Sequence, residues 1–125
     1  MTTLLRVLLV EDHPDTRDLL ASYLRSAGHE VEVARTMREG TSALGEQTWD
    51  LVLSDLGLPD GNGWEMLRAA GTGRARLAVA MSGFGTRVDR ARSRAAGFHE
   101  HLTKPLDLNV VDRVVARAQA AKQAA

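Results

Sequence analysis

The chain has 125 residues, with 16 basic and 16 acidic side chains and therefore a formal net charge of +0. A chain of this length most simply forms a single domain over residues 1–125, with a core from about residue 6 to residue 118, and its balanced charge favours neither nucleic acid nor an anionic membrane as a partner. Cysteine is absent, which excludes disulfide bonds and cysteine chemistry and is typical of a reducing compartment.

The first residues do not have the pattern of a signal peptide. Their apolar run is interrupted by Arg6 and followed by Glu11 and Asp12, whereas a signal peptide has a basic start and an unbroken apolar stretch. No segment has the roughly 20 apolar residues that cross a bilayer. We therefore expect a cytoplasmic protein that makes no membrane contact of its own.

Short apolar runs and helical patterns alternate along the first third of the chain. Arg6–Val10 is apolar and branched and predicts a strand. Pro14 suits the first turn of a helix, and Gly28 has the usual helix-stop position. Glu30–Ala34 alternates polar with apolar residues, which predicts a strand near the edge of a sheet.

The next two elements lead to a conspicuous acid. Thr36–Glu39 matches a capping box and opens a helix that runs to about Gln47, weakened by two glycines. The apolar run Leu51–Asp55 predicts a buried strand, because a loop rich in glycine and proline follows it. Asp55 then lies at the carboxyl end of a strand, where a carboxylate has to be solvated, paired or bound to a cation.

The same alternation continues to the end. We expect a helix over Gly63–Ala70, a strand over Arg76–Met81, and a helix that a capping box at Thr86–Asp89 opens and Gly97 ends. A short strand over Glu100–Thr103 precedes Lys104 and Pro105. Asp107 caps the last helix, and the chain from Ala116 on, rich in Ala, Gln and Lys, is expected to fray or to lead into a linker.

Five strands that alternate with five helices predict an α/β fold with a parallel sheet covered on both faces. In such sheets the ligand crevice lies beyond the carboxyl ends of the strands. The residues that end the predicted strands are therefore the functional candidates: Glu11 and Asp12, Asp55, Ser82, and Lys104.

These residue types suit one kind of chemistry. Three carboxylates brought together repel one another unless a cation lies between them, and Mg²⁺ (or Mn²⁺) is the hard ion that oxygen ligands prefer. A carboxylate can attack phosphorus as a nucleophile, and phosphoryl transfer then needs mainly positioning and charge stabilisation. Lys104 offers a positive charge, and the Ser82 hydroxyl and the loop backbone near Gly57 and Gly83 offer hydrogen-bond donors.

From Arg6 to about Ala118 the sequence resembles the receiver domains of two-component response regulators, and most of all those attached to hybrid histidine kinases. Each motif is short, but four occur in the right order and each ends a predicted strand. They are Glu11-Asp12, Asp55 with Leu58-Pro59-Asp60-Gly61, Ser82-Gly83, and Lys104-Pro105.

The resemblance implies the family fold, a doubly wound (βα)5 flavodoxin-like sandwich with strand order 2-1-3-4-5. It implies that Asp55 is the phosphoacceptor and takes its phosphoryl group from a histidine kinase or a histidine phosphotransfer protein. It also implies a magnesium site in which Asp12 binds directly, Glu11 binds through water, and the Gly57 carbonyl completes the protein ligands. Such a domain catalyses its own phosphorylation and dephosphorylation.

Further roles follow from the same resemblance. Lys104 would contact the phosphoryl group, and the Lys104–Pro105 peptide bond would be cis. The Ser82 hydroxyl would move to a phosphoryl oxygen and begin the switch. A downstream protein partner would then bind the face made by the fourth helix, the fifth strand and the fifth helix.

His101 departs from the family pattern, which usually has Tyr or Phe three residues before the lysine. A histidine keeps a planar ring but is polar and titratable. Two interpretations stay open: a switch residue that senses pH, and a surface histidine tolerated in an edge strand. A zinc site at His99 and His101 is disfavoured, because nothing nearby supplies further ligands.

Two other functions compete with the phosphorylated switch. A receiver-like interaction module that is never phosphorylated would usually have lost an acid or the lysine. A flavodoxin-like cofactor binder would bring a phosphate against Glu11, Asp12 and Asp55, beside a first loop that lacks glycine.

The segment from Arg74 to Arg94 holds six arginines and one acid, Asp89. No aromatic platform or reading element accompanies them, so a solvated helix face is favoured over nucleic acid binding. An acidic protein partner at Arg90 and Arg94 is a further hypothesis. Because the sequence ends with the last predicted helix, we expect a stand-alone regulator or a segment of a larger protein.

Overall fold

The computed structural model describes residues 2–71, 73–83 and 85–125. Along these residues strands and helices alternate, as the sequence predicts, and one extra pair of short strands follows the third strand. In chain order the elements are β1 (Arg6–Val10), α1 (Pro14–Ser26), β2 (Glu30–Ala34), α2 (Met37–Glu46), β3 (Trp49–Asp55), β4 (Gly57–Leu58), β5 (Gly61–Asn62), α3 (Gly63–Ala70), β6 (Ala75–Ser82), α4 (Arg87–Ala96), β7 (Glu100–Thr103) and α5 (Leu108–Gln123).

The main sheet has five parallel strands in the order β2-β1-β3-β6-β7. This is the predicted order 2-1-3-4-5, because the short antiparallel pair β4–β5 takes two numbers in the chain. The alternating strand β2 lies at an edge, as its pattern predicts, and the apolar strand β3 lies at the centre. The expected doubly wound fold is confirmed.

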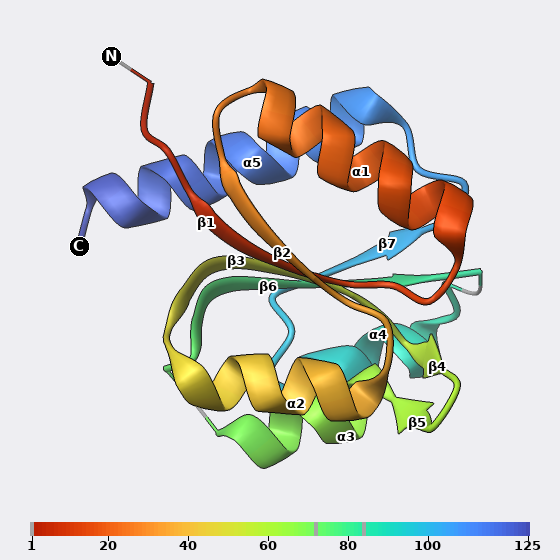
Figure 1. The fold of residues 1–125 in the computed structure, drawn as a ribbon. Helices are drawn as coiled ribbons and strands as arrows, with labels where there is room; N and C mark the ends of the chain where they lie inside the picture. The colour runs from red at the N-terminus through yellow and green to blue at the C-terminus, as the bar shows by residue number, and fades with distance from the viewer. Residues whose placement is uncertain (1, 72, 84) are drawn as a thin grey trace.

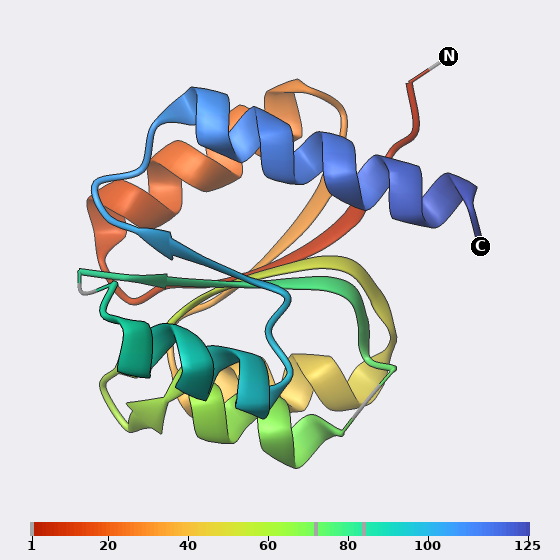
Figure 2. The ribbon, with the colours of Figure 1, turned by 180° about the vertical axis from the view of Figure 1, so that it is seen from behind.

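Helices cover both faces of this sheet. In Figure 1, α1 and α5 lie above it, and α2, α3 and α4 lie below it. Alternate residues of β1 serve the two sides: Val7 and Leu9 belong to one core cluster with residues of α1 and α5, whereas Leu8 and Val10 belong to the other. Seen from behind, β7 runs between α5 and α4 (Figure 2).

The predicted helix starts are confirmed by their capping bonds. Thr36 Oγ1 accepts the N–H of Glu39 at 3.0 Å, and Thr86 Oγ1 accepts the N–H of Asp89 at 3.1 Å. Each bond satisfies one of the backbone donors that a helix start leaves without a partner. Gly97 ends α4 at a φ of +112°, a conformation that other residues adopt with strain.

The hairpin β4–β5 was not predicted, and it anchors the loop after β3 to α2. Between its strands, Asp60 accepts the backbone N–H groups of Met37 and Arg38 at 2.7 and 3.0 Å. The first of these bonds does most to lower the pKa of Asp60 below its usual value. The start of α2 is thus capped twice, by its own Thr36 and by a residue of the loop beside the strand ends.

The expectation that the chain frays from Ala116 on is wrong. Helix α5 continues to Gln123 because side chains of its last turns bond to β3 and to the residues before β1. Lys122 donates to the Asp50 carboxylate at 3.0 Å, and Gln119 donates to the Thr3 carbonyl at 2.8 Å. Within the described ranges, no helix is long and apolar enough to cross a membrane.

Candidate functional site

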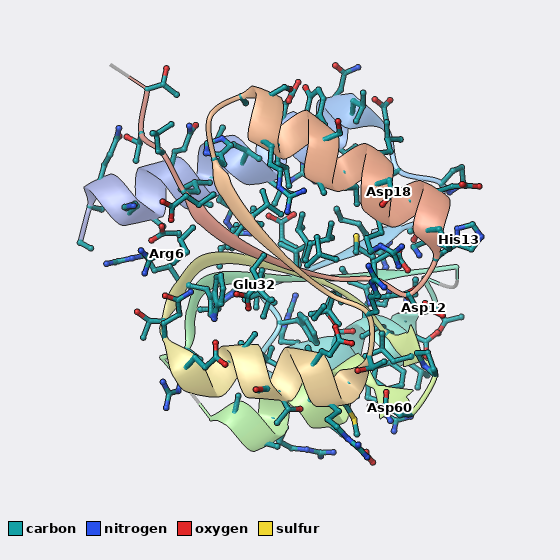
Figure 3. All side chains as sticks on the ribbon, in the orientation of Figure 1. Arg6, Asp12, His13, Asp18, Glu32 and Asp60 are labelled. Carbon is teal, nitrogen blue, oxygen red and sulfur yellow. The ribbon has the colours of Figure 1, made fainter. Side chains whose placement is uncertain are left out.

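The predicted strand-end residues gather at one edge of the sheet. The parallel register places Asp55 beside Met81 and Ser82 beside Thr103, so consecutive strands end together. Figure 3 labels Asp12 and Asp60 at this edge and Arg6 toward the other end of the sheet. The carboxyl edge therefore carries the acids that the sequence singled out.

Lys104 joins two of these acids. Its ammonium lies 2.5 Å from Glu11 Oε1 and 3.0 Å from Asp55 Oδ2. The Glu11 side chain has no exposed surface, and those of Asp55 and Lys104 are 15% and 24% exposed. A fully buried carboxylate would be costly alone. Here its partner is the Lys104 ammonium, which follows the edge strand β7.

Burial dominates the protonation behaviour of this pair. It raises the pKa of Glu11, and neighbouring Asp55 raises it further, while the bond to Lys104 opposes both. Burial alone would lower the pKa of Lys104, but its hydrogen bonds to Glu11 and Asp55 together outweigh that effect and raise the pKa. Lys104 is therefore a fixed positive charge at neutral pH.

Glu11, Asp12 and Asp55 can each offer a carboxylate oxygen, and these oxygens lie within 4.8 Å of one another. Ligands of an octahedral Mg²⁺ are about 3–4 Å apart, so small side-chain movements would bring these oxygens around one ion. The donor set is all oxygen and acidic, and Asp12 is exposed, which leaves room for water ligands. The residues fit a hard divalent cation.

Gly57 lies in β4, and its N–H is 3.4 Å from Asp55 Oδ1. The participation of its carbonyl in a metal site stays a prediction.

The end of β3 is positioned by close backbone packing. Leu56 donates its N–H to the Met81 carbonyl at 3.0 Å, and Gly63 donates to the Leu56 carbonyl at 2.9 Å. A Cβ on Gly63 would lie 2.7 Å from the Asp55 carbonyl oxygen and 3.1 Å from Ser54 Oγ. Only glycine allows α3 to begin this close to the candidate nucleophile.

Ser82 and Lys104 are held by neighbouring backbones. The Lys104 N–H donates to the Ser82 carbonyl at 2.7 Å, and the Lys104–Pro105 peptide bond is cis, the isomer that the resemblance implied. The Ser82 hydroxyl lies 2.7 Å from His101 Nε2. His101 is half-buried, and its Nδ1 lies 2.9 Å from Ser93 Oγ. Both ring nitrogens of His101 therefore make polar contacts, and its role as a switch residue stays a prediction.

Sequence reasoning missed the two residues beyond His101. Ser93 in α4 is buried, and it accepts the indole N–H of Trp64 from α3 at 2.9 Å. The Arg92 guanidinium lies 4.0 Å from the centre of the Trp64 ring. A lone serine in an arginine-rich helix gives no signal in the sequence, because its partners come from other elements.

His99 and the arginines contact different elements of the fold. His99 Nδ1 accepts the Ala78 N–H at 2.9 Å, and the described residues contain no cluster of potential metal ligands besides the acidic one. The arginines do not form one patch. Arg76 pairs with Asp50 at 3.4 Å near the amino ends of β6 and β3, whereas Arg90 and Arg94 are exposed on α4.

Comparison with known proteins gives one answer. Residues 7–116 match the family model described as response regulator receiver domain. An uncharacterized 14.6 kDa protein of Leptolyngbya boryana is 36% identical over 104 residues, which are 81% of this chain and 79% of that protein. The virulence transcriptional regulatory protein PhoP of Salmonella typhimurium is 34% identical over 94% of this chain and 51% of its own length. The chain thus spans about half of that relative.

Solved structures agree on the fold. A CheY-like receiver domain of Methanospirillum hungatei has a TM-score of 0.87 at 25% identity and covers 98% of this chain and 100% of its own. The receiver domain of a sensor histidine kinase of Pseudomonas aeruginosa, with a coordinated magnesium ion, has a TM-score of 0.82 at 26% identity and covers 94% and 99%. The similar structures include a CheY-like domain as well as the receiver domain of a sensor histidine kinase, so attachment to a hybrid histidine kinase stays a prediction.

Proposed function

Because this chain belongs to the family of response regulator receiver domains, we propose that Asp55 is its phosphoacceptor and that the strand-end residues around it form the phosphorylation site. The observation that carries the proposal is the contact of the Lys104 ammonium with both Glu11 and Asp55 at the carboxyl edge of the sheet. It brings the nucleophile, a metal-binding acid and the charge-stabilising cation of the proposed reaction together.

In the reaction, an Asp55 carboxylate oxygen attacks the phosphorus of a phosphohistidine. The new O–P bond forms as the P–N bond breaks, and the imidazole of the donor takes up a proton as it leaves. Lys104 lies next to Asp55 Oδ2, where its charge offsets the negative charge of the phosphoryl oxygens. Ser82, which ends the neighbouring strand, supplies a hydroxyl to one of those oxygens.

Glu11, Asp12 and Asp55 would hold Mg²⁺, with the Gly57 carbonyl as a further ligand. When bound, the ion neutralises the acids and the transferred phosphoryl group. Asp12 is the exposed member of the set and Glu11 the buried one. This difference supports a direct role for Asp12 and a water-mediated role for Glu11, whose oxygens already accept Lys104 and the His13 N–H.

Receiver domains interact with histidine kinases or phosphotransfer proteins. We assign the donor contact to an apolar groove of about 440 Å³ between α1 and the start of α5. Lys104 and Pro105 line it together with Leu19, which is 57% exposed, and Leu108. The proposed occupant is the phosphodonor protein, because its histidine must reach Asp55 and the groove is lined by Lys104, which contacts Asp55.

The downstream partner is assigned to the face formed by α4, β7 and α5, visible in Figure 2. A groove of about 250 Å³ on this face is lined by Arg90 and Arg94, and by Arg113, which pairs with Glu100 at 3.1 Å. Arg90 and Arg94 favour an acidic protein surface. Arg90→Glu combined with Arg94→Glu should weaken binding of a labelled acidic peptide, and binding that survives charge reversal would contradict this assignment.

The decisive experiment is incubation with Mg²⁺ and acetyl phosphate, followed by intact mass measurement. The wild-type chain should gain one phosphoryl group, and Asp55→Asn should gain none. Asp60→Asn is the matched control, because Asp60 lies in the same loop but caps α2; it should be phosphorylated like the wild type. No gain by the wild type under saturating donor would favour an interaction module that is never phosphorylated.

A further inference from the structure

A chain of polar contacts leads from Ser82 to the surface of α3. It passes from Ser82 Oγ to His101 Nε2 at 2.7 Å, from His101 Nδ1 to Ser93 Oγ at 2.9 Å, and from Ser93 Oγ to Trp64 Nε1 at 2.9 Å. It crosses from the end of β6 through β7 and α4 to α3. The paired residues are 8 to 29 positions apart in the sequence, and their polar groups meet only in the folded chain.

The indole end fixes the direction of these hydrogen bonds. An indole N–H can only donate, so Ser93 Oγ accepts from Trp64. Ser93 is 1% exposed, and its hydroxyl has no other hydrogen-bond partner than Trp64 and His101 among the described residues. Its single hydrogen therefore has one place to go, which is His101 Nδ1.

The opposite arrangement would be costly. If Nδ1 carried the hydrogen, Ser93 Oγ would accept from both neighbours and its buried O–H would make no bond. A buried donor left without a partner is unfavourable, because it loses its hydrogen bond to water on folding and gains none in return. A neutral His101 therefore accepts at Nδ1 and carries its hydrogen on Nε2, which donates to Ser82 Oγ.

We propose that Ser93 and His101 are positioning residues for Ser82. Ser93 holds His101 in the Nε2–H tautomer, and His101 then donates to Ser82 Oγ. Ser82 therefore directs its own hydrogen away from His101, toward a phosphoryl oxygen on Asp55. This inference rests on the proposed function of Asp55. It adds that a hydrogen-bonded histidine replaces the usual aromatic ring. It also adds that a change in the hydrogen bonding of Ser82 alters the hydrogen bond of the Trp64 indole on α3.

The tautomer can be read from the long-range ¹H–¹⁵N spectrum of the imidazoles at about pH 8, where histidine is neutral. His29 and His99 are internal references, because their Nδ1 atoms accept backbone N–H groups and their hydrogens must lie on Nε2. His101 should show the same pattern. In Ser93→Ala it should become a mixture, and Ser93→Thr, which keeps the hydroxyl, should restore it. An Nδ1–H signal for His101 in the wild type would overturn the proposal.

The coupling to α3 is tested by the Trp64 indole N–H resonance upon phosphorylation with acetyl phosphate. It should shift in the wild type, and most of the shift should be lost in Ser93→Ala and in His101→Phe, which keeps a planar ring without hydrogen bonds. Trp49 is the control, since its indole donates to the Ala43 carbonyl and should not respond. Equal shifts in all three proteins would overturn the coupling.

Intact mass measured on the same samples separates the two proposals. Absence of the phosphoryl group in the wild type would contradict the function of Asp55. Full phosphorylation with an unresponsive Trp64 in the wild type would contradict only the coupling. Slower phosphorylation of Ser93→Ala, with recovery in Ser93→Thr, would support the positioning of Ser82, because a generally loosened helix α4 would not recover with the hydroxyl.

Discussion

The Lys104 ammonium lies 2.5 Å from the carboxylate of Glu11, a side chain with no exposed surface. The two residues are 93 positions apart in the sequence, and their contact joins the end of β1 to the residue after β7. The buried Glu11 carboxylate thus depends for its compensating charge on Lys104, a residue distant in the sequence.

Lys104→Met should lower both stability and phosphorylation. Removing one partner of a buried pair leaves the other charge uncompensated, which costs about 3 kcal/mol, and burial then raises the pKa of Glu11 without opposition. Urea unfolding measures the loss. The control is Lys122→Met, which removes a more exposed lysine paired with Asp50 and should cost about 1 kcal/mol or less. Equal losses in the two variants would contradict the role of burial.

Mg²⁺ should raise the melting temperature of the wild type, because a ligand that binds only the folded state stabilises it. Asp12→Asn removes one of three negative charges from the site and should weaken Mg²⁺ binding about tenfold or more, a loss of at least about 1.4 kcal/mol. Asp15→Asn removes an exposed acid in the first turn of α1 and should leave the Mg²⁺ effect intact. An unchanged Mg²⁺ response in Asp12→Asn would argue against this ligand set.

Gly63→Ala should destabilise the protein by about 1–3 kcal/mol, the usual cost of forcing an extra carbon into packed structure. It should also slow phosphorylation, because the added carbon meets the carbonyl of Asp55 itself. Gly45→Ala is the opposite case. A Cβ there meets nothing within 4 Å, so a helical alanine should stabilise by about 0.5–1 kcal/mol. Unfolding free energies with the same sign for both variants would refute this account.

His29 should make stability depend on pH. Its ring is buried and its Nδ1 accepts the Leu5 N–H at 3.0 Å, and burial lowers its pKa in the folded protein. The unfolded chain, with a pKa of about 6.5, therefore binds more protons, so this contribution is fully present above about pH 6.5 and is lost as the pH falls.

The check is the free energy of unfolding between about pH 7.5 and about pH 5.5, a range that spans the unfolded pKa. His29→Asn keeps an acceptor but cannot be protonated, so its stability should change less over this range than that of the wild type. His13→Asn, at an exposed position that makes no side-chain cap, should follow the wild type. A wild-type slope that persists in His29→Asn would assign the pH dependence to other groups.

Most of the fold could be predicted because its signals are local. Each of these signals lies within a few residues of the element that it predicts. Examples are the apolar pattern of each strand, the capping boxes at Thr36 and Thr86, and the helix stop at Gly97. The hairpin β4–β5 was not predicted because its strands have only two residues each, too few to show a periodic pattern. The end of α5 was misjudged because Lys122 and Gln119 look like a solvated tail until their partners Asp50 and Thr3 are in place.

The sequence by itself determined which residues end the strands, and a parallel sheet then brings all strand ends to one edge. Asp12, Asp55, Ser82 and Lys104 were found in this way, because covalent order and strand direction suffice to place them. The tertiary structure alone decided which of them touch and what surrounds His101. Hydrogen-bond partners such as Ser93 and Trp64 come from other helices, and their meeting depends on side-chain packing between layers, which leaves no periodic trace in the chain.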